Sequence, residues 1–277
     1  MLSEDEKNRY AEHGVLFPLR VLQAEEVTTV RQRYTQLEQA LGGRPTPLEL
    51  TQLHRAFQWA WDVAAHPAAL DIAESLIGPD LAIWATSVFC KYPEDDAYVG
   101  WHQDSRYWAM SGDDVVSVWI ALTPSTVENG AMQVMRGTHL GQLQHHQEGT
   151  SSKNVLSRAQ EIRDLPACPD VVDVQLAPGE CSIHHVRAIH GSQANSSPLQ
   201  RIGFVTRYVP PWTRQPNPME VGVLRGSIAA FSGQNLVARP ADDDVSEEAI
   251  VRFRASVSQF LGRTRTAAAK SADNEGS

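Results

Sequence analysis

The stretch LAIWATSVFCKY, residues 81–92, opens the part of the chain that decides the fold. It is rich in β-branched and aromatic side chains, which favour strands, and it begins just after the turn residue Gly78. Further segments of the same character follow, separated by turn-forming residues, at 115–123, 131–135, 171–176, 181–186 and 201–209. Short strands in succession, without a helix between each pair, favour a β sandwich or barrel over alternating βαβ units.

Helical patterns flank this region on both sides. Residues 24–41 place apolar side chains three and four positions apart, on one face of a helix. A second amphipathic run over 67–78 begins at a proline and ends at a glycine, while 51–65 fits a helix less cleanly. A last helix is expected over about 245–261.

We therefore expect a single, mainly β domain with flanking helices over residues 1–265. It divides into a helical N-terminal part at 1–78, a β core at 79–212 and a C-terminal helical segment at 213–265. Residues 266–277 are small and polar, so a disordered tail is expected there.

Composition excludes several classes of partner. The 277 residues are 42% hydrophobic, which suffices for a large core. A net charge of −9 without a basic stripe argues against binding to nucleic acid or to an anionic membrane. The charged N-terminus and the lack of a run of about 18 apolar residues predict a soluble, cytoplasmic protein. The oligomeric state is not readable. Neither a disulfide framework nor a cysteine zinc site is indicated, because no CxxC pair occurs among Cys90, Cys168 and Cys181.

The segment WHQD, residues 101–104, is the most informative motif. In an extended segment positions i and i+2 project to the same side, so His102 and Asp104 can face one ion. His190, at the end of a later predicted strand, can supply a third ligand. Two imidazoles and one carboxylate leave open positions for co-substrate and dioxygen, as in Fe(II) oxygenases. Zinc is chemically possible with the same donors.

An HxD pair alone is a weak signal, because such pairs occur by chance. The chain has ten histidines, and rival sets can be composed on paper from His54, His139, His145, His146, His184 and His185. The rest of the pattern is what favours the set built on HxD.

A second group of residues suits a diacid co-substrate. Such a molecule chelates iron through one end and leaves a carboxylate that needs a cation, for which the planar fork of Arg201 is suited. Ser192 can add a hydroxyl donor. Strand alternation places Lys91 on one face with Phe89 and Ser87, and in another strand places Trp119 on one face with Ser117 and Ala121. Lys91 can instead reach water from a strand end.

Taken together, these motifs resemble the phytanoyl-CoA dioxygenase-like family of Fe(II)/2-oxoglutarate oxygenases. The resemblance runs from YAEHGVLFPLRVL to about residue 212 and rests on WHQD, FCKYP, VWIAL, ENGAMQVMRGTHL, IHHVRAIHGS and RIGFVTRYVPP. It implies a double-stranded β-helix, or jelly-roll, core of the cupin type. It also implies iron ligation by His102, Asp104 and His190. Binding of 2-oxoglutarate is implied for Arg201, Ser192, Lys91 and Trp119.

Two features of the motifs differ from some relatives. Arg136 replaces the usual proline before GTH, which affects a turn and not the metal. Asp104 completes the HxD motif, whereas related halogenases have a small residue there, so chloride has no coordination site and oxidation of the substrate is expected.

The resemblance implies Fe(II) as cofactor and 2-oxoglutarate and O2 as co-substrates. We expect hydroxylation of an unactivated C–H bond of a small or medium polar molecule, with release of succinate and CO2. An amino-acid derivative, an organophosphonate or a natural-product intermediate would fit. Desaturation, ring closure or epimerisation at the same centre stays an alternative, and a non-catalytic jelly-roll binding module is a rival of another class. No side chain is nominated as a general base.

Substrate residues are harder to place. The loop after HxD offers Arg106, Tyr107 and Trp108, with His184 as a further candidate, although a surface ion pair and core packing explain such residues equally well. Arg207 shares strand parity with Arg201, and a structural role is expected for it. The polar connection 141–165 has the length of a lid and favours a closed pocket over the groove of a protein hydroxylase.

Overall fold

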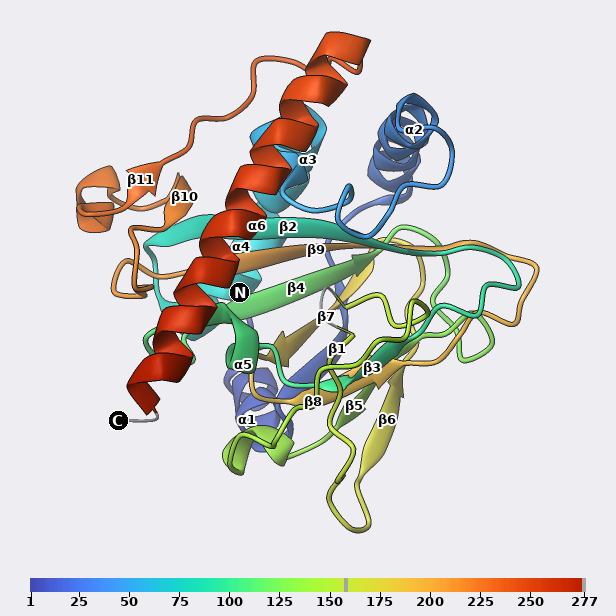
Figure 1. The fold of residues 1–277 in the computed structure, drawn as a ribbon, viewed down its shortest axis with the longest axis vertical. Coiled ribbons are helices and arrows are strands. Elements are labelled where there is room, and N and C mark those ends of the chain that lie inside the picture. The colour runs from blue at the N-terminus through green and yellow to red at the C-terminus, as the bar shows by residue number, and fades with distance from the viewer. Residues whose placement is uncertain (157–158, 276–277) are drawn as a thin grey trace.

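Two β sheets, antiparallel except for one pair of strands at an edge, form the centre of the molecule. The computed structural model describes residues 1–156 and 159–275, with side chains described up to residue 262 apart from that gap. The larger sheet has the order β1-β7-β4-β9-β2-β10-β11, and the smaller sheet has the order β3-β8-β5-β6 (Figure 1). In the larger sheet the strands are β1 (Val15–Arg20), β7 (Glu180–His185), β4 (Val116–Ala121), β9 (Arg201–Val209), β2 (Leu81–Lys91), β10 (Glu220–Arg225) and β11 (Asn235–Leu236). In the smaller sheet they are β3 (Val99–His102), β8 (Ile189–Ser192), β5 (Met132–Met135) and β6 (Val171–Val174).

Each strand segment read from the sequence is present, so the mainly β class with flanking helices is confirmed. The helices are α1 (Glu4–His13), α2 (Ala24–Ala40), α3 (Gln58–Ala64), α4 (Pro67–Ile77), α5 (Ser105–Trp108) and α6 (Glu247–Glu275), with short 3-10 turns η1 (Leu53–Arg55), η2 (Thr138–Leu140) and η3 (Ile228–Phe231). The single helix expected over 51–65 is instead divided into η1 and α3. Helix α6 continues past the expected end at 261 and includes most of the segment 266–277 that was expected to be a disordered tail. Residues 276–277 of that segment lie outside the described part of the chain.

Helix α1 and strand β1 were not expected from apolar periodicity. Helix α1 carries a different signal, a capping box in which the Ser3 side chain accepts from the backbone of Glu6 while the Glu6 carboxylate accepts from the backbone of Ser3. Its C-terminus is Gly14, whose φ of 71° suits a left-handed cap. Strand β1 then pairs with β7 at the edge of the larger sheet.

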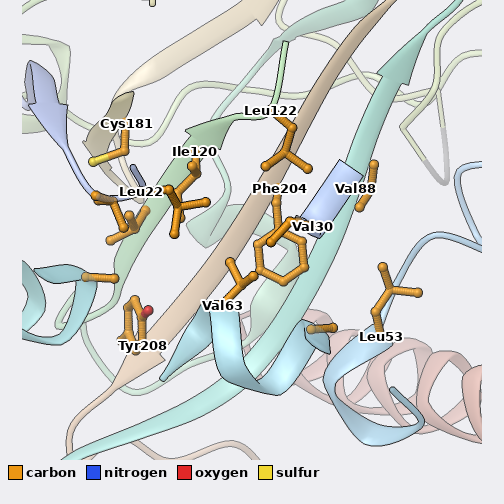
Figure 2. Close-up of a cluster of buried hydrophobic side chains, with 14 of the residues drawn as sticks. Leu22, Val30, Leu53, Val63, Val88, Ile120, Leu122, Cys181, Phe204 and Tyr208 are labelled. Atoms are coloured by element: carbon orange, nitrogen blue, oxygen red, sulfur yellow. The ribbon is translucent and has the colours of Figure 1, made fainter. Parts of the chain in front are cut away.

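The outer face of the larger sheet packs against the helices. Side chains from β2, β4 and β9, among them Val88, Ile120 and Phe204, meet Leu53 of η1 and Val63 of α3 in one buried cluster (Figure 2). The β strands supply these residues at alternate positions, while α2 and α4 add their apolar stripes. The helical layer therefore covers the outer face of the larger sheet.

The inner face of the larger sheet looks toward the smaller sheet. A second buried cluster joins Trp119 and Val205 of the larger sheet to Met132 and Val134 of the smaller one. Helix α6 begins beside α3, with Phe253 packed on Phe57 at 5.1 Å between ring centroids, and then crosses one end of the sheet pair toward α5 (Figure 1). The two sheets and α6 together enclose the cavity described below.

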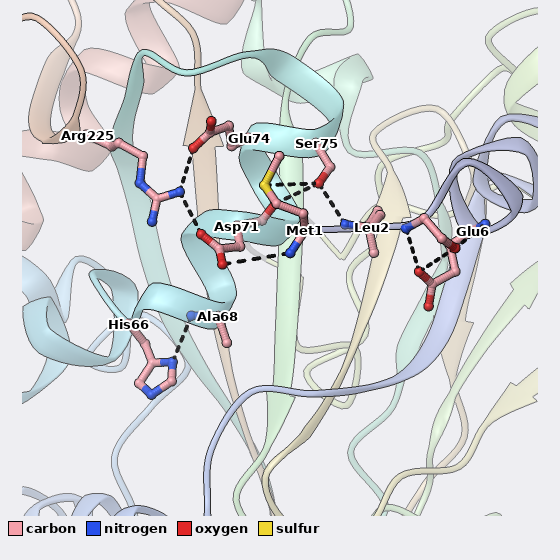
Figure 3. Close-up of polar contacts among 10 residues, drawn as sticks. Met1, Leu2, Glu6, His66, Ala68, Asp71, Glu74, Ser75 and Arg225 are labelled. Carbon is pink, nitrogen blue, oxygen red and sulfur yellow. Dashed lines mark hydrogen bonds and ion pairs between the residues drawn. The ribbon is translucent and has the colours of Figure 1, made fainter.

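The N-terminus is tied to the body of the protein by polar contacts. The Met1 amino group lies 3.7 Å from Asp71 of α4, and Arg225 of β10 binds both Asp71 at 2.8 Å and Glu74 at 2.5 Å (Figure 3). The backbone N–H of Leu2 donates to Ser75 at 2.8 Å. These contacts link the first residues, α4 and β10. In the described part of the chain, no helix has the length and apolar character needed to cross a membrane.

Candidate metal centre

Two neighbouring strands of the smaller sheet bring together the residues of the HxD motif and His190. His102 at the end of β3 and His190 in β8 are direct partners across the antiparallel ladder. Asp104 follows two residues later, at the entry to α5. Among the described residues these three side chains form the one group whose ligand atoms lie close enough for a metal, all within 4.8 Å of one another. All three are buried.

The two histidine rings are oriented in the same way. Nδ1 of His102 lies 2.9 Å from the carbonyl oxygen of Gly100, and Nδ1 of His190 lies 2.9 Å from that of Ala188. A carbonyl can only accept, so each Nδ1 carries the proton and donates. Each Nε2 is then left with a lone pair, which is the form in which histidine binds a metal.

The charge states of the group also suit a cation. Burial opposes ionisation of Asp104, but the neighbouring His102, His190 and Arg207 side chains outweigh this, so the pKa of Asp104 lies below its ordinary value. Burial, followed by repulsion from His102 and His184, holds the pKa of His190 well below its ordinary value. A neutral imidazole beside an ionised carboxylate is a donor set ready for a divalent ion.

The other histidines are placed in ways that do not form a rival set. His54, His139 and His146 bond to protein groups through Thr86, Ala11 and the Gln103–Gln144 pair, respectively, and His145 is exposed. His184 of β7 lies nearest the centre, with its Nε2 3.9 Å from Asp104 and its ring 4.7 Å from that of His190. Burial lowers the pKa of His184 to about 4.

The residues proposed for the co-substrate also come together. Lys91 and Arg201 are direct cross-strand partners on β2 and β9. The Lys91 ammonium donates to Ser192 at 2.7 Å and to the carbonyl of Gln193, and Arg201 donates to the carbonyl of Gly130 at 2.6 Å. The Arg201 guanidinium lies 5.4 Å from the centre of the Trp119 ring.

This pair of buried cations needs an anion. Like charges directly opposite each other destabilise a sheet, and in the described part of the chain no carboxylate lies within 4.0 Å of Lys91 or Arg201. Burial and then the Arg201 charge lower the pKa of Lys91 to about 6, and burial lowers that of Arg201 to about 10. The Nε atom of Arg201 is buried without a partner. A carboxylate of a bound diacid would satisfy these groups.

Gly203 makes room for the indole beside this site. A Cβ atom at Gly203 would lie 1.8 Å from the Trp119 ring, so no other residue fits there without moving Trp119. Since Gly203 lies between Arg201 and Val205 on the same face of β9, the ring can lie across the strand. The RIGFV segment thus supplies Arg201 and, through Gly203, the space that the Trp119 ring occupies.

A cavity of about 240 Å³ joins the two groups. Besides the candidate ligands it is lined by His184, Tyr107 and Trp108, three of the candidate substrate residues, and by Leu156 and Gln160 from the 141–165 connection. Arg106 is exposed and lines a neighbouring hollow instead. The lining also includes Gln52, Trp84, Phe260 and Arg207, which the sequence did not predict to face a site.

The remaining departure noted in the sequence lies on the surface. Arg136 forms a two-point ion pair with Asp170, at 2.9 Å for each hydrogen bond. Its backbone N–H donates to the carbonyl of the same aspartate at 2.8 Å. The residue therefore stabilises a turn next to β5, away from the cavity.

The chain is similar in sequence to a known enzyme family. A model of the family described as Phytanoyl-CoA dioxygenase (PhyH) matches residues 10–203. A probable alpha-ketoglutarate-dependent hypophosphite dioxygenase of Stutzerimonas stutzeri is 27% identical over 133 residues, 48% of this chain and 46% of that protein. The L-proline trans-4-hydroxylase of Streptomyces griseoviridis is 30% identical over 149 residues, 50% of this chain and 56% of that protein. The chain spans about half the length of these curated relatives.

Among solved structures, the apo form of the non-haem monooxygenase ThoJ is similar over nearly the whole chain. Its TM-score is 0.77 at 27% identity, and the match covers 96% of this chain and 98% of that one. The shared fold confirms the predicted jelly-roll core of the cupin type, although the two sheets described here are not closed into a barrel.

Proposed function

This chain belongs to the phytanoyl-CoA dioxygenase (PhyH) family, and on that premise we propose that it is an Fe(II)- and 2-oxoglutarate-dependent dioxygenase that hydroxylates a small polar molecule. The observation that carries the proposal is the cavity with two chemically different ends. One wall holds two imidazoles and a carboxylate with free ligand atoms. The other holds Arg201, which has Lys91 as its cross-strand neighbour, and among the described residues neither has a carboxylate partner within 4.0 Å.

In this proposal His102, Asp104 and His190 hold the iron. Their donor atoms fit Fe(II), because the Nδ1 protons are already engaged by carbonyl groups and the carboxylate is ionised. When bound, the iron supplies the redox chemistry by which dioxygen oxidises both 2-oxoglutarate and the substrate. The overall reaction inserts one oxygen atom into a C–H bond and yields succinate and carbon dioxide.

The task of the protein side chains is to bind and orient. Arg201 offers a planar fork to the distal carboxylate of 2-oxoglutarate, and Lys91 adds a second charge held in place by Ser192. Trp119 closes the side of this pocket, and burial of the whole site excludes water from the oxidant. No residue in this scheme acts as a general base.

The size of the cavity favours a small substrate. The cavity volume of about 240 Å³ lies below the usual range of roughly 300–1,000 Å³ for ligand pockets. In the proposed reaction this volume holds both 2-oxoglutarate and the substrate. The curated relatives are named for hypophosphite and L-proline, which are both small and polar. These facts support a small polar molecule over a fatty acyl-CoA.

The test is formation of succinate. Anaerobically purified protein is given Fe(II) and 2-oxoglutarate, oxygen is admitted, and succinate is measured for the wild type and for His102→Ala. We expect slow succinate release by the wild type and none by the variant. A wild type that binds neither Fe(II) nor 2-oxoglutarate would contradict the proposal and would favour a binding module.

A further inference from the structure

Arg207 lies on the same face of β9 as Arg201, six positions further along the strand. At about 3.3 Å per residue the two Cα atoms are roughly 20 Å apart. In the ladder Arg207 is opposite Ala85 of β2 and Ser117 of β4, so it stands in the interior of the larger sheet. Both arginines line the same cavity, with the candidate metal ligands also on its wall.

The guanidinium of Arg207 is only partly engaged by the protein. It donates to Ser87 at 3.3 Å and lies 5.1 Å from the centre of the Trp108 ring. Its Nε atom is buried without a partner, and among the described residues no carboxylate lies within 4.0 Å of it. Burial lowers the pKa of Arg207, and the nearby Asp104 opposes this only in part. A half-buried cation with a buried, unpaired Nε atom is unfavourable unless an anion completes it.

Gln52 presents a second set of unsatisfied polar atoms to this cavity. Its side chain is 1% exposed, and neither its amide oxygen nor its amide nitrogen has a partner. Its backbone is in the left-handed region, with φ of 59°, and its N–H donates to the carbonyl of Thr86 at 2.7 Å. A strained backbone and an unpaired buried amide are both unfavourable, and a polar group of a bound ligand would offset the cost of the unpaired amide.

Contacts between neighbouring residues bring Gln52 near Arg207. Thr51 and Ser87 form a β-bridge, and their hydroxyl groups are 3.3 Å apart. Ser87 is the residue to which Arg207 donates. The 51–52 turn and the middle of β9 therefore face each other across β2.

We propose that Arg207 and Gln52 form the substrate-recognition end of the cavity, and that the substrate carries a carboxylate bound by Arg207. The inference rests on the proposed function, whose substrate class it narrows. The planar fork of Arg207 matches a carboxylate, while the Gln52 amide can both donate to and accept from a second polar group of the substrate. The body of the substrate packs against Trp84, Trp108 and Phe260, whose rings are 5.1–6.0 Å apart.

A role for Arg207 in balancing the charge of Asp104 can be distinguished from a role in binding substrate. If Arg207 served only to balance the charge of Asp104, its loss would weaken iron binding and would not alter any preference among substrates. If it binds a substrate carboxylate, its loss removes that preference while iron and 2-oxoglutarate still bind.

The experiment uses the holoprotein without oxygen, loaded with Fe(II) and saturating 2-oxoglutarate, so that the Arg201 end is occupied. Isothermal titration calorimetry measures the affinity of the protein for three acids, acetate, L-proline and phenylacetate, and for the primary amide of each acid. We expect at least one acid to bind roughly tenfold or more tightly than its amide, as charge-assisted hydrogen bonds imply. No preference for any acid would overturn the inference.

The variants assign the preference to a residue. Arg207→Gln is expected to bind acid and amide equally, Arg207→Lys to keep part of the preference, and Gln52→Leu to bind the preferred acid more weakly. Arg106→Gln, which alters an exposed arginine outside this cavity, is expected to keep the full preference. An unchanged preference in Arg207→Gln, or loss of its iron, would overturn the inference. A wild type that binds no Fe(II) or 2-oxoglutarate would instead remove the proposed function itself, and the inference with it.

Discussion

Lys91 is a lysine whose surroundings favour the uncharged form. It is 1% exposed and faces Arg201 across the strand pair, and burial together with that neighbour lowers its pKa to about 6. A carboxylate bound between the two side chains would favour the charged ammonium again. Binding of a diacid and protonation of Lys91 are therefore linked.

We predict that 2-oxoglutarate binding at pH 7.5 takes up close to one proton per site. The reason is that Lys91 is mostly neutral at this pH before binding and charged afterwards, so affinity also falls as pH rises above about 6. Calorimetry of the iron-loaded protein in buffers of different ionisation enthalpy measures the uptake. Lys91→Met should abolish it, and uptake that is unchanged in this variant would show that another group titrates.

Some residues of the candidate site could be predicted from the sequence, and others could not. His102 and Asp104 could be paired from the HxD spacing, although β3 ends at His102 and Asp104 has helical backbone angles at the entry to α5. Lys91 could be given a strand face by alternation, and Arg201 was suggested by the chemistry of a diacid. Gln52 could not be predicted, because no local pattern indicates that a glutamine will adopt a left-handed backbone and turn into a cavity. Arg207 was expected to be structural, and its unpaired Nε atom became visible only in the folded chain.

At the scale of elements, α6 connects the helical layer to the cavity. Phe253 near its start is 2% exposed and packs on Phe57, while Phe260, about two turns later, lines the cavity beside Trp84. The sequence predicted this helix from its apolar positions, but not the residues against which it packs. An apolar stripe shows which face of a helix is buried and does not show which surface it contacts.

We predict that Phe253→Ala lowers the free energy of unfolding by about 3–5 kcal/mol, since it removes a buried aromatic ring and leaves a hole. Val251→Ala on the same helix is the matched control, because Val251 is 60% exposed, and it should change stability by less than about 1 kcal/mol. Urea denaturation of both variants measures the difference. Equal effects would mean that α6 does not pack on α3 in solution.

Element boundaries differ from prediction where local and tertiary signals compete. The run 51–65 carries apolar residues throughout, yet it divides into η1 and α3, with Phe57 extended at φ of −122° between them. This division allows Gln52 to pair with β2 and His54 to reach Thr86. Helix α1 was missed because its apolar residues are few, although its capping box was present in the sequence.

For the whole molecule, the order of the strands in the two sheets could not be predicted from the pattern of residues alone. Strands that are far apart in the chain, such as β2 with β9 and β3 with β8, are neighbours in the sheets. Only the family resemblance implied that arrangement, since strand periodicity reveals faces but not partners. The site depends on this pairing, because each half of it is drawn from strands distant in sequence.

Buried histidines make the stability of the whole molecule sensitive to acid. His54 is fully buried, and burial lowers its pKa to about 3, below the ordinary value of 6.5 in an unfolded chain. Between these values the unfolded chain binds more protons, so the free energy of unfolding falls as pH decreases from 6.5 toward 3. The penalty amounts to about 1.4 kcal/mol per pH unit for one such group.

We predict that the metal-free protein loses about 2 kcal/mol of stability between pH 6.5 and pH 5 through His54. Urea denaturation at the two pH values measures the loss, and His54→Gln should show a loss smaller by about this amount. The comparison concerns the pH dependence alone, because the substitution also alters the contact with Thr86. An identical pH dependence in both proteins would show that His54 is already protonated in the folded state.

The most direct test of the account is binding of Fe(II) itself. Anaerobic equilibrium dialysis compares the wild type with His102→Ala, Asp104→Ala and His190→Ala, and with His145→Ala, which removes an exposed histidine as the matched control. We predict one Fe(II) per chain for the wild type and the control. For each triad variant we predict affinity lower by more than the roughly 10–100-fold that an outer-sphere partner contributes. Wild-type affinity in the triad variants, or no bound iron in the wild type, would contradict the account.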